Sequence, residues 1–264
     1  MTKKTKIVSD FYGKEYSKKS KYQEFMGEKL IKMIDFDKYH YILDLGCGNG
    51  TNGIKMAKNK NTFIDGFDAA KESIKIANEK KESLGIKNIK FFIEDAYKFN
   101  EKNKYDLVFS NFAINWIGPK SFEIAYNTLK QEGKLIASIG LGYEGISYGH
   151  EEIVLEAIDN LGYSKYFENY IEKIYHPRKE EAHEDVKKAN FKNIDIEQLA
   201  INQKPFYDSL KESYISVLIT ELNFKYLYLE NDQQRQNLFN ECLKICLEKK
   251  PQIINLALII SADK

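Results

Sequence analysis

Three glycines at positions 46, 48 and 50 follow a carboxylate, Asp44, in the stretch LDLGCGNG. Glycines at this spacing let a ligand approach the main chain, because no Cβ obstructs it, and they open a helix whose N-terminal amides face that ligand. The spacing is G-x-G-x-G rather than the G-x-G-x-x-G of dinucleotide-binding loops. A carboxylate before the loop suits a cationic or hydroxylated ligand better than a pyrophosphate, since two anions at one place repel each other. The stretch therefore argues against NAD and FAD.

Two further acidic side chains follow later β runs of the sequence. Asp68 closes the run Gly66-Phe67-Asp68, where an acid can accept both hydroxyls of a ribose. Asp95, in the run Glu94-Asp95-Ala96, could accept the exocyclic amine of an adenine. A fourth stretch, SNFAINW at 110–116, follows the next β run beside the expected switch point of the sheet. Together these residues predict a nucleoside-like ligand.

The four stretches, in this order, resemble the class I S-adenosylmethionine-dependent methyltransferases over about residues 40 to 140. Residues 44–50 match that family's D-x-G-x-G-x-G cofactor loop. Residues 110–116 look like the S-N-x-x-x-x-W stretch of trans-aconitate, malonyl-carrier-protein and juvenile hormone acid methyltransferases, a branch that methylates carboxylates. The N/D-P-P-Y/F loop of the amino-methyltransferases is replaced by Ser-Asn-Phe-Ala, which argues against adenine-N6, cytosine-N4 and protein-glutamine methylation.

The resemblance implies S-adenosyl-L-methionine as the cofactor and S-adenosyl-L-homocysteine as its product. Asp44 and the loop amides would hold the amino-acid portion, Asp68 the ribose and Asp95 the adenine. The residues expected to contact the cofactor are Tyr16, Asp44, Gly46, Cys47, Gly48, Asn49, Asp68, Ala69, Asp95, Ala96 and Asn111. Those expected at the reacting methyl group are Asn115, Trp116 and His150.

Methyl transfer from a sulfonium is an in-line displacement, so the protein's main task is to align and desolvate two reactants. A carboxylate acceptor is ionised near neutral pH and needs no general base. No obvious base stands in the four stretches, which favours a small or carrier-borne carboxylic acid as acceptor. An amine, phenol or carbon acceptor is the alternative. An RNA or protein methyltransferase and a non-catalytic cofactor-binding partner subunit also stay open.

Several of these residues have a purely structural alternative. Asp68 could cap a helix, Asp95 could be a surface turn residue, and Trp116 could belong to the core. Cys242 and Cys246 lie one helical turn apart and could bind a metal with a histidine. They share their face with leucine and phenylalanine side chains, so a buried apolar stripe is favoured and no metal site is predicted.

The elements that must position these residues alternate between strand and helix. The sequence predicts strands at 41–45, 62–67, 89–93, 105–110 and 134–139, and helices at about 22–34, 51–60, 70–84 and 119–130. Helices between successive strands imply parallel pairing in a doubly wound α/β sheet with helices on both faces. Beyond residue 140 the pattern predicts a helix at 178–189, strands at 193–197 and 253–262, and a wholly helical region at 205–249.

The predicted architecture is a Rossmann-like sheet of seven strands, parallel except for an antiparallel final strand. Three parts are expected: an N-terminal helical arm at 1–40, a cofactor-binding core at 41–140, and a helical cap with the last two strands at 141–264.

Composition limits the choice of partner and compartment. Among 264 residues, 43% are hydrophobic and 30% charged, as in globular proteins. The net charge is +1 and only two basic residues are arginine, which argues against a nucleic-acid partner. Three cysteines give no disulfide framework, so we expect a cytoplasmic protein. The apolar run at 253–262 is about half the roughly 20 residues of a membrane-spanning helix, so no membrane partner is expected. The oligomeric state is not predicted.

Overall fold

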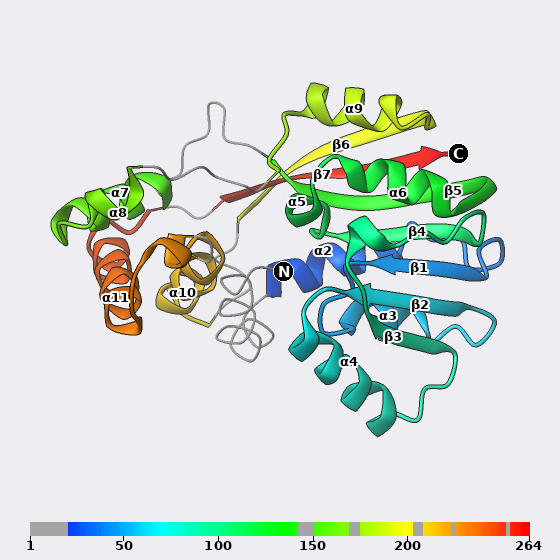
Figure 1. The fold of residues 1–264 in the computed structure, drawn as a ribbon, viewed down its shortest axis with the longest axis horizontal. Helices are drawn as coiled ribbons and strands as arrows, with labels where there is room; N and C mark the ends of the chain where they lie inside the picture. Colours follow the sequence, from blue (N-terminus) through cyan, green and yellow to red (C-terminus); the bar gives the residue numbers. More distant parts are fainter. Residues whose placement is uncertain (1–20, 142–149, 169–174, 203–207, 223–224, 252–253) are drawn as a thin grey trace. The chain divides into compact units, whose positions relative to one another are not determined.

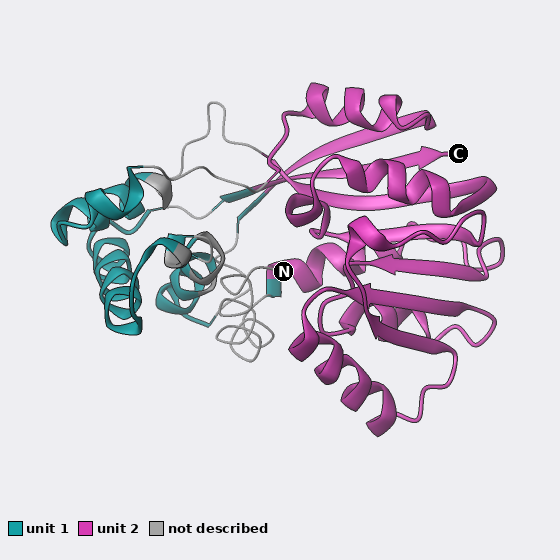
Figure 2. Cartoon of the chain, viewed as in Figure 1, with its two compact units in different colours: residues 1–21, 143–173, 201–255 teal, residues 22–142, 174–200, 256–264 magenta. Residues whose placement is uncertain are grey.

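A computed structural model describes residues 21–141, 150–168, 175–202, 208–222, 225–251 and 254–264. The chain divides into two compact units, shown in Figure 2. The sheet unit comprises residues 22–142, 174–200 and 256–264, and the helical unit comprises residues 1–21, 143–173 and 201–255. Each unit is described by itself below.

Seven strands of the described chain form one sheet in the order β3-β2-β1-β4-β5-β7-β6 (Figure 1). The strands are β1 Tyr41–Leu45, β2 Phe63–Asp68, β3 Ile89–Ile93, β4 Tyr105–Asn111, β5 Leu129–Gly140, β6 Lys192–Asn202 and β7 Ile254–Asp263. Strands β1 to β5 pair in parallel, and β7 runs antiparallel to β5. The predicted seven-stranded α/β sheet with an antiparallel final strand is confirmed.

Helices cover both faces of this sheet. They are α2 Lys21–Ile31, α3 Thr51–Met56, α4 Lys71–Ser83, α5 Ile114–Ile117, α6 Lys120–Thr128 and α9 Lys179–Lys188, with a 3-10 turn at Ala96–Lys98. Strands β1 and β4 are largely buried, because a parallel strand between two helical layers meets little water on either side.

Some predicted boundaries were wrong. The helix expected at 119–130 ends at Thr128, and β5 begins at Leu129 rather than at residue 134. The reason is a pairing between Leu129 and Tyr105, which extends the β4–β5 ladder across a register shift. The short helix α5 was not predicted, and β6 is longer than the strand expected at 193–197.

The described residues of the helical unit form α7 His150–Asn160, α8 Ser164–Phe167, α10 Leu210–Glu221 and α11 Asp232–Lys249. A 3-10 turn at Lys225–Tyr228 separates α10 from α11. Cys242 and Cys246 are buried in a core that also includes Val154 and Leu218. Burial raises the pKa of the Cys242 thiol to about 12 and that of Cys246 to about 11. Both cysteines are therefore buried in the apolar core of the helical unit, which confirms the predicted apolar stripe.

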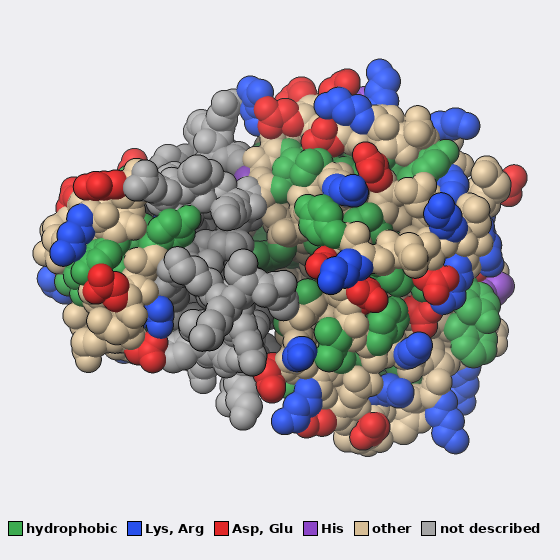
Figure 3. Space-filling view, viewed as in Figure 1, with side chains coloured by type: hydrophobic (Ala, Val, Ile, Leu, Met, Phe, Trp, Pro, Cys, Tyr) green, Lys and Arg blue, Asp and Glu red, His purple; other side chains and the backbone are tan. Residues whose placement is uncertain are grey.

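Two observations bear on a nucleic-acid partner and on a membrane partner. On the face seen in Figure 3, lysines of the sheet unit are interspersed with acidic side chains rather than gathered into one basic area. Within the part of the chain that the structure describes, no helix is long and apolar enough to cross a membrane.

Candidate functional site

The acidic residues singled out by the sequence lie at one edge of the sheet. Parallel pairing aligns Asp44 of β1 with Gly66 of β2, and Asp68 of β2 with Ile93 of β3. Because parallel strands end at the same edge, the segments that follow β1, β2, β3 and β4 meet there, at the switch in strand order between β1 and β4. The candidate site is this carboxyl edge of the sheet.

The glycine loop between β1 and α3 needs its glycines for two different reasons. Gly46, Gly48 and Gly50 all adopt the left-handed region, with φ of 71°, 53° and 76°. A Cβ on Gly46 would lie 2.2 Å from the Cβ of Ala113, so Gly46 permits close packing of the loop on the segment after β4. Among the residues that the structure describes, a Cβ on Gly48 would meet nothing within 4 Å. The main chain at Gly48 is therefore open to a ligand.

Asp68 is fixed by main-chain amides. Its Oδ2 accepts the N–H of Gly48 at 2.9 Å, and its Oδ1 accepts the N–H of Ala70 at 2.8 Å. Burial raises the pKa of Asp68, while these N–H groups and that of Ala69 oppose the rise. The residue at the N-cap of α4 is Ala70 rather than Asp68. Asp68 thus ties the glycine loop to the start of α4.

Asp44 is buried, with only 2% of its surface exposed. Its Oδ2 has no hydrogen-bond partner in the described structure, and it lies close to Gly53, where an added Cβ would be 3.2 Å away. Burial, and secondarily the charge of Asp68, raise the pKa of Asp44 to about 7, against the opposing effect of the Gly53 amide. A buried carboxylate oxygen without a donor would be stabilised by a cation or a hydrogen-bond donor of a ligand.

Cys47 and Asn49 make contacts that hold the glycine loop in place. The Cys47 N–H donates to the Phe67 carbonyl at 2.9 Å, and burial raises the pKa of its thiol well above the usual range. Asn49 Oδ1 accepts the Thr51 hydroxyl at 2.6 Å. Lys80 Nζ on α4 donates to the Asn49 carbonyl at 3.3 Å. These contacts fix the loop against β2 and α4.

Asp95 follows β3 at the same edge, and the structure gives it a local role. Its Oδ1 accepts the N–H of Tyr97 at 3.0 Å and so caps the 3-10 turn that begins at the buried Ala96. This contact uses one of the two carboxylate oxygens, and each oxygen has two lone pairs. The capping role therefore leaves acceptor positions on Asp95, and its role in binding stays a prediction.

The residues after β4 divide into buried and exposed ones. Asn111 is engaged on both sides of its amide, because Nδ2 donates to the Gln23 carbonyl at 2.9 Å and Oδ1 accepts the Ser138 hydroxyl at 2.8 Å. Asn115 is 5% exposed and bonded to Gly140, whereas Trp116 is 41% exposed and is therefore not a core residue.

Two predicted site residues cannot be placed at this edge. Tyr16 lies outside the described residues. His150 begins α7 in the helical unit, and its side chain lies outside the described part of the structure. Ala69 immediately follows Asp68, so its main chain belongs to the edge.

Helix α2 contributes residues that the sequence did not single out. Tyr22 packs against Phe112, with ring centroids 5.3 Å apart, and the Gln23 carbonyl holds Asn111. Lys55 of α3 donates to Glu24 and Glu28 of α2, at 2.7 Å in each case. The Glu24–Glu28 spacing of one helical turn is a signal that could have predicted a shared basic partner. Helix α2 therefore closes one side of the edge.

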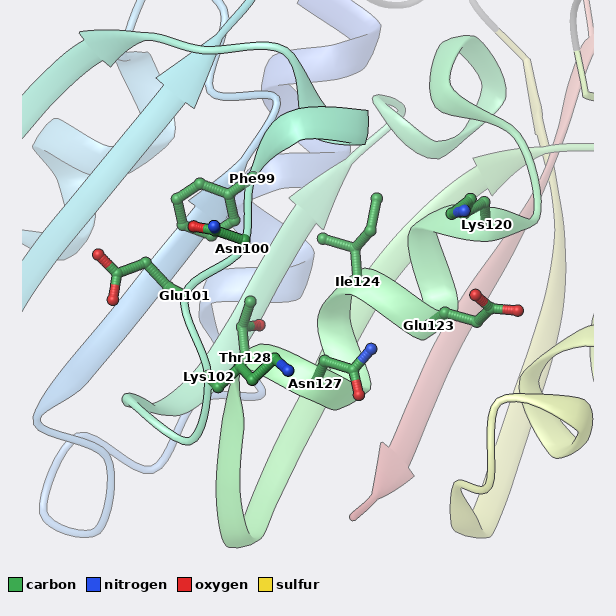
Figure 4. A pocket seen from close by; sticks show the side chains of 9 residues that line it. All are labelled: Phe99, Asn100, Glu101, Lys102, Lys120, Glu123, Ile124, Asn127 and Thr128. Atoms are coloured by element: carbon green, nitrogen blue, oxygen red, sulfur yellow. The ribbon is translucent and has the colours of Figure 1, made fainter.

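A separate pocket of about 250 Å³ lies between α6 and the segment before β4 (Figure 4). Phe99, Ile124 and Thr128 line it, together with charged side chains such as Lys102 and Glu123. Thr128 precedes β5 and residue 102 precedes β4, so this pocket is at the amino ends of the strands. It is not part of the candidate site.

Comparison with known proteins finds matches to part of this chain. Residues 36–148 match the family model described as a methyltransferase domain. Malonyl-acyl-carrier-protein O-methyltransferase 1 of Ilyobacter polytropus is 35% identical over 130 residues, which are 47% of this chain and 47% of that protein. The chain thus spans about half the length of the curated relatives it matches.

Solved structures share the fold at low identity. Haemonchus contortus phosphoethanolamine N-methyltransferase 2, in complex with phosphomonomethylethanolamine and S-adenosylhomocysteine, has a TM-score of 0.54 and 21% identity, covering 85% of this chain and 49% of that one. The cyclase SpnF has a TM-score of 0.60 and 13% identity, covering 90% and 80%. These likenesses concern the fold, since one fold can host different reactions. Residues 36–148 therefore match a methyltransferase-domain model, and the order of the seven strands in the described chain is consistent with the class I methyltransferase fold.

Proposed function

We propose that the chain is an S-adenosyl-L-methionine-dependent methyltransferase whose acceptor is a carboxylic acid, either small or borne on a carrier protein. The observation that carries the cofactor part is the pair of bonds at Asp68, one from Gly48 and one from Ala70. These bonds fix the carboxylate beside the glycine loop and, together with the Ala69 N–H that also acts on it, leave part of its roughly four acceptor positions unused. The remaining capacity suits a ribose hydroxyl.

The other residues of the edge fit the same ligand. S-adenosylmethionine carries a sulfonium and an ammonium group, and the buried, unpartnered oxygen of Asp44 is suited to a cationic ligand. The open main chain at Gly48 is suited to close approach. Asp44 and the loop amides would hold the amino-acid portion, Asp68 the ribose, and Asp95 with Ala96 the adenine. When bound, the cofactor supplies an electrophilic methyl group on a positively charged sulfur.

The contribution of the chain to the reaction is positional. Good alignment of two reactants can lower a barrier by about 7 to 11 kcal/mol. Asp44 and Asp68 are held on neighbouring strands of a rigid sheet, so the ligand groups that they bind would keep a fixed orientation. The loop after β4 packs on Gly46 through Ala113, so in this proposal the acceptor side would begin next to the cofactor loop.

Two observations support a carboxylic acid as acceptor. The relatives that match residues of this chain at 34 to 35% identity are named as O-methyltransferases of malonyl-acyl-carrier protein. Residues 110–113 are Ser-Asn-Phe-Ala, without the prolines of the amino-methyltransferase loop. A carboxylate is already ionised near pH 7, so it needs no proton removed before it attacks.

Calorimetry with S-adenosylmethionine and S-adenosylhomocysteine tests the cofactor. We expect Asp68→Ala to weaken binding at least tenfold, about 1.4 kcal/mol, while Asp37→Asn, an exposed acid before β1, leaves binding unchanged. Absence of binding by the wild-type protein would refute the proposal. Methyl transfer to malonyl-loaded carrier protein, compared with unloaded carrier, tests the acceptor. Transfer to the unloaded carrier alone would refute a carboxylate acceptor.

A further inference from the structure

The glycine loop rests on α4 at two places. A Cβ added to Gly50 would lie 2.8 Å from the Cβ of Ala77, so the main chain of the loop packs directly against the helix. Lys80 follows Ala77 by three residues, which places it on the same side of α4. Its Nζ donates to the Asn49 carbonyl and to the Thr51 hydroxyl, at 3.3 Å in each case. One lysine of α4 therefore contacts the loop on both sides of Gly50.

Lys80, Thr51 and Asn49 are joined in a ring of hydrogen bonds. The Thr51 hydroxyl accepts from Lys80 and donates to Asn49 Oδ1 at 2.6 Å, while the Asn49 carbonyl accepts from Lys80. Asn49 is thus held through its main chain and its side chain. Its neighbours Gly48 and Gly50 lie in the left-handed region, and glycine has more conformational freedom than any other residue. The ring of hydrogen bonds therefore restrains the part of the loop that its own sequence restrains least.

The main-chain N–H groups of the restrained segment are not all in use. Those of Cys47, Gly48 and Gly50 each donate to an oxygen of the protein. No described residue accepts the N–H of Asn49. An N–H group of this kind can donate to a carboxylate, and such hydrogen bonds are stronger than those between neutral groups. Fixing Asn49 therefore fixes the direction of a donor that a ligand carboxylate could use.

Lys80 also brings a positive charge to the loop. Its two acceptors, a carbonyl and a hydroxyl, are neutral. Burial lowers the pKa of Lys80, and the charge of Glu24 on α2 opposes this effect, although Glu24 is itself paired with Lys55 at 2.7 Å. Asp44 precedes the loop and Asp68 is bonded to it, so their charges repel an anionic ligand group. A cation bonded to the loop offsets part of that repulsion.

We propose that Lys80 is a positioning residue for the carboxylate of the cofactor's amino-acid portion, acting through Asn49 and Thr51 rather than on the ligand itself. The inference deepens the proposed function and rests on it. Without Lys80 the loop loses both the restraint on Asn49 and the nearby charge. Asp68 keeps its bonds from main-chain N–H groups, so the proposed ribose contact is unaffected. Loss of Lys80 therefore weakens ligands that carry the amino-acid portion and spares those that lack it.

Calorimetry with two ligands tests this selectivity. S-adenosylhomocysteine has the amino-acid portion, whereas 5′-methylthioadenosine has the same adenosine with only a methyl group on its sulfur. We expect Lys80→Met to weaken binding of S-adenosylhomocysteine at least tenfold and to change that of 5′-methylthioadenosine less than twofold. Lys80→Arg, which keeps a cationic donor, should recover most of the lost affinity. Lys75→Met, which removes an exposed lysine of the same helix, is the matched control and should change neither affinity.

Thr51→Val tests the same contact from the side of the loop. It removes the hydroxyl between Lys80 and Asn49 and should show the same selective loss, so the test does not depend on the folding of Lys80→Met alone. Urea unfolding of each variant checks that the protein is folded. Unchanged affinity for S-adenosylhomocysteine in the folded variants, or an equal loss for both ligands, overturns the role of Lys80. A wild-type protein that binds neither ligand counts against the proposed function instead.

Discussion

Asp44 and Asp68 stand at the carboxyl ends of neighbouring parallel strands, and the charge of Asp68 disfavours ionisation of Asp44. The two residues differ in their hydrogen bonds. Asp68 accepts the N–H groups of Gly48 and Ala70, whereas a buried oxygen of Asp44 has no hydrogen-bond partner among the described residues. The ionised form of Asp44 is therefore the destabilised one of the pair. Its effect on the stability of the protein can be measured without a ligand.

Asp44 should make the ligand-free protein less stable as pH rises from about 4 to 7. Its folded-state pKa of about 7 lies above the ordinary 3.8, so the native state binds this proton more tightly than the unfolded state within that window. The loss approaches roughly 4 kcal/mol and is complete above about pH 7. Urea unfolding from pH 4 to 8.5 measures it. Asp44→Asn should remove this component, and parallel pH profiles for the two proteins would contradict the explanation.

Gly48→Ala should abolish cofactor binding at little cost to folding. The φ of 53° strains alanine by about 1 kcal/mol, and the new methyl group meets no protein atom within 4 Å. It would occupy the space that the ligand needs. Gly85→Ala is a matched control, since Gly85 has a φ of 64° and equally open surroundings after α4. Unfolding and calorimetry should show similar destabilisation in both variants but lost affinity only in Gly48→Ala. Equal affinity in the two variants would place the ligand elsewhere.

Gly46→Ala should instead damage the fold, by more than about 3 kcal/mol. A Cβ there would lie 2.2 Å from the Ala113 Cβ, which is overpacking in addition to a φ of 71°. Removing the opposing methyl group with Ala113→Gly should restore part of the stability in the double variant. A double-mutant cycle in urea measures the coupling. Strictly additive effects would show that the close approach is not the source of the damage.

Lys55→Met should lower the stability of the protein by an amount that depends on salt. Lys55 pairs with Glu24 and Glu28 at 2.7 Å each, on a largely exposed surface. Such pairs are worth about 1 kcal/mol or less, and a Debye length of about 3 Å in 1 M salt screens them. The stability difference from wild type should therefore shrink between low salt and 1 M NaCl. Lys58→Met, on the exposed end of the same region, should show no such dependence.

The sheet and the glycine loop were predictable because their signals are local. The apolar run at 41–45, the glycines after it and the acid at the end of the next strand each report a nearby backbone requirement. The structure confirms the strands at these places and puts Asp44 and Asp68 at one edge. The boundary between α6 and β5 was missed because Leu129 pairs with Tyr105, a residue 24 positions earlier in the chain.

The surroundings of Asn115 could not be predicted in the same way. Its partners are main-chain groups of Gly140 and Tyr175, and a main-chain group has no signature in the sequence. Trp116 was expected at the reacting methyl group, and the structure adds that it is exposed.

The strand order also has a consequence for biosynthesis. Strand β7 lies between β5 and β6, so β6 is joined to the rest of the sheet only through a strand that follows it in the chain. While the ribosome still holds residues 254–263, β5 has an open edge and β6 has no neighbour to pair with. Exposed strand edges are where chains associate wrongly. Completion of the sheet therefore waits for residues 254–263, and until they pair the nascent chain keeps an open strand edge that needs protection.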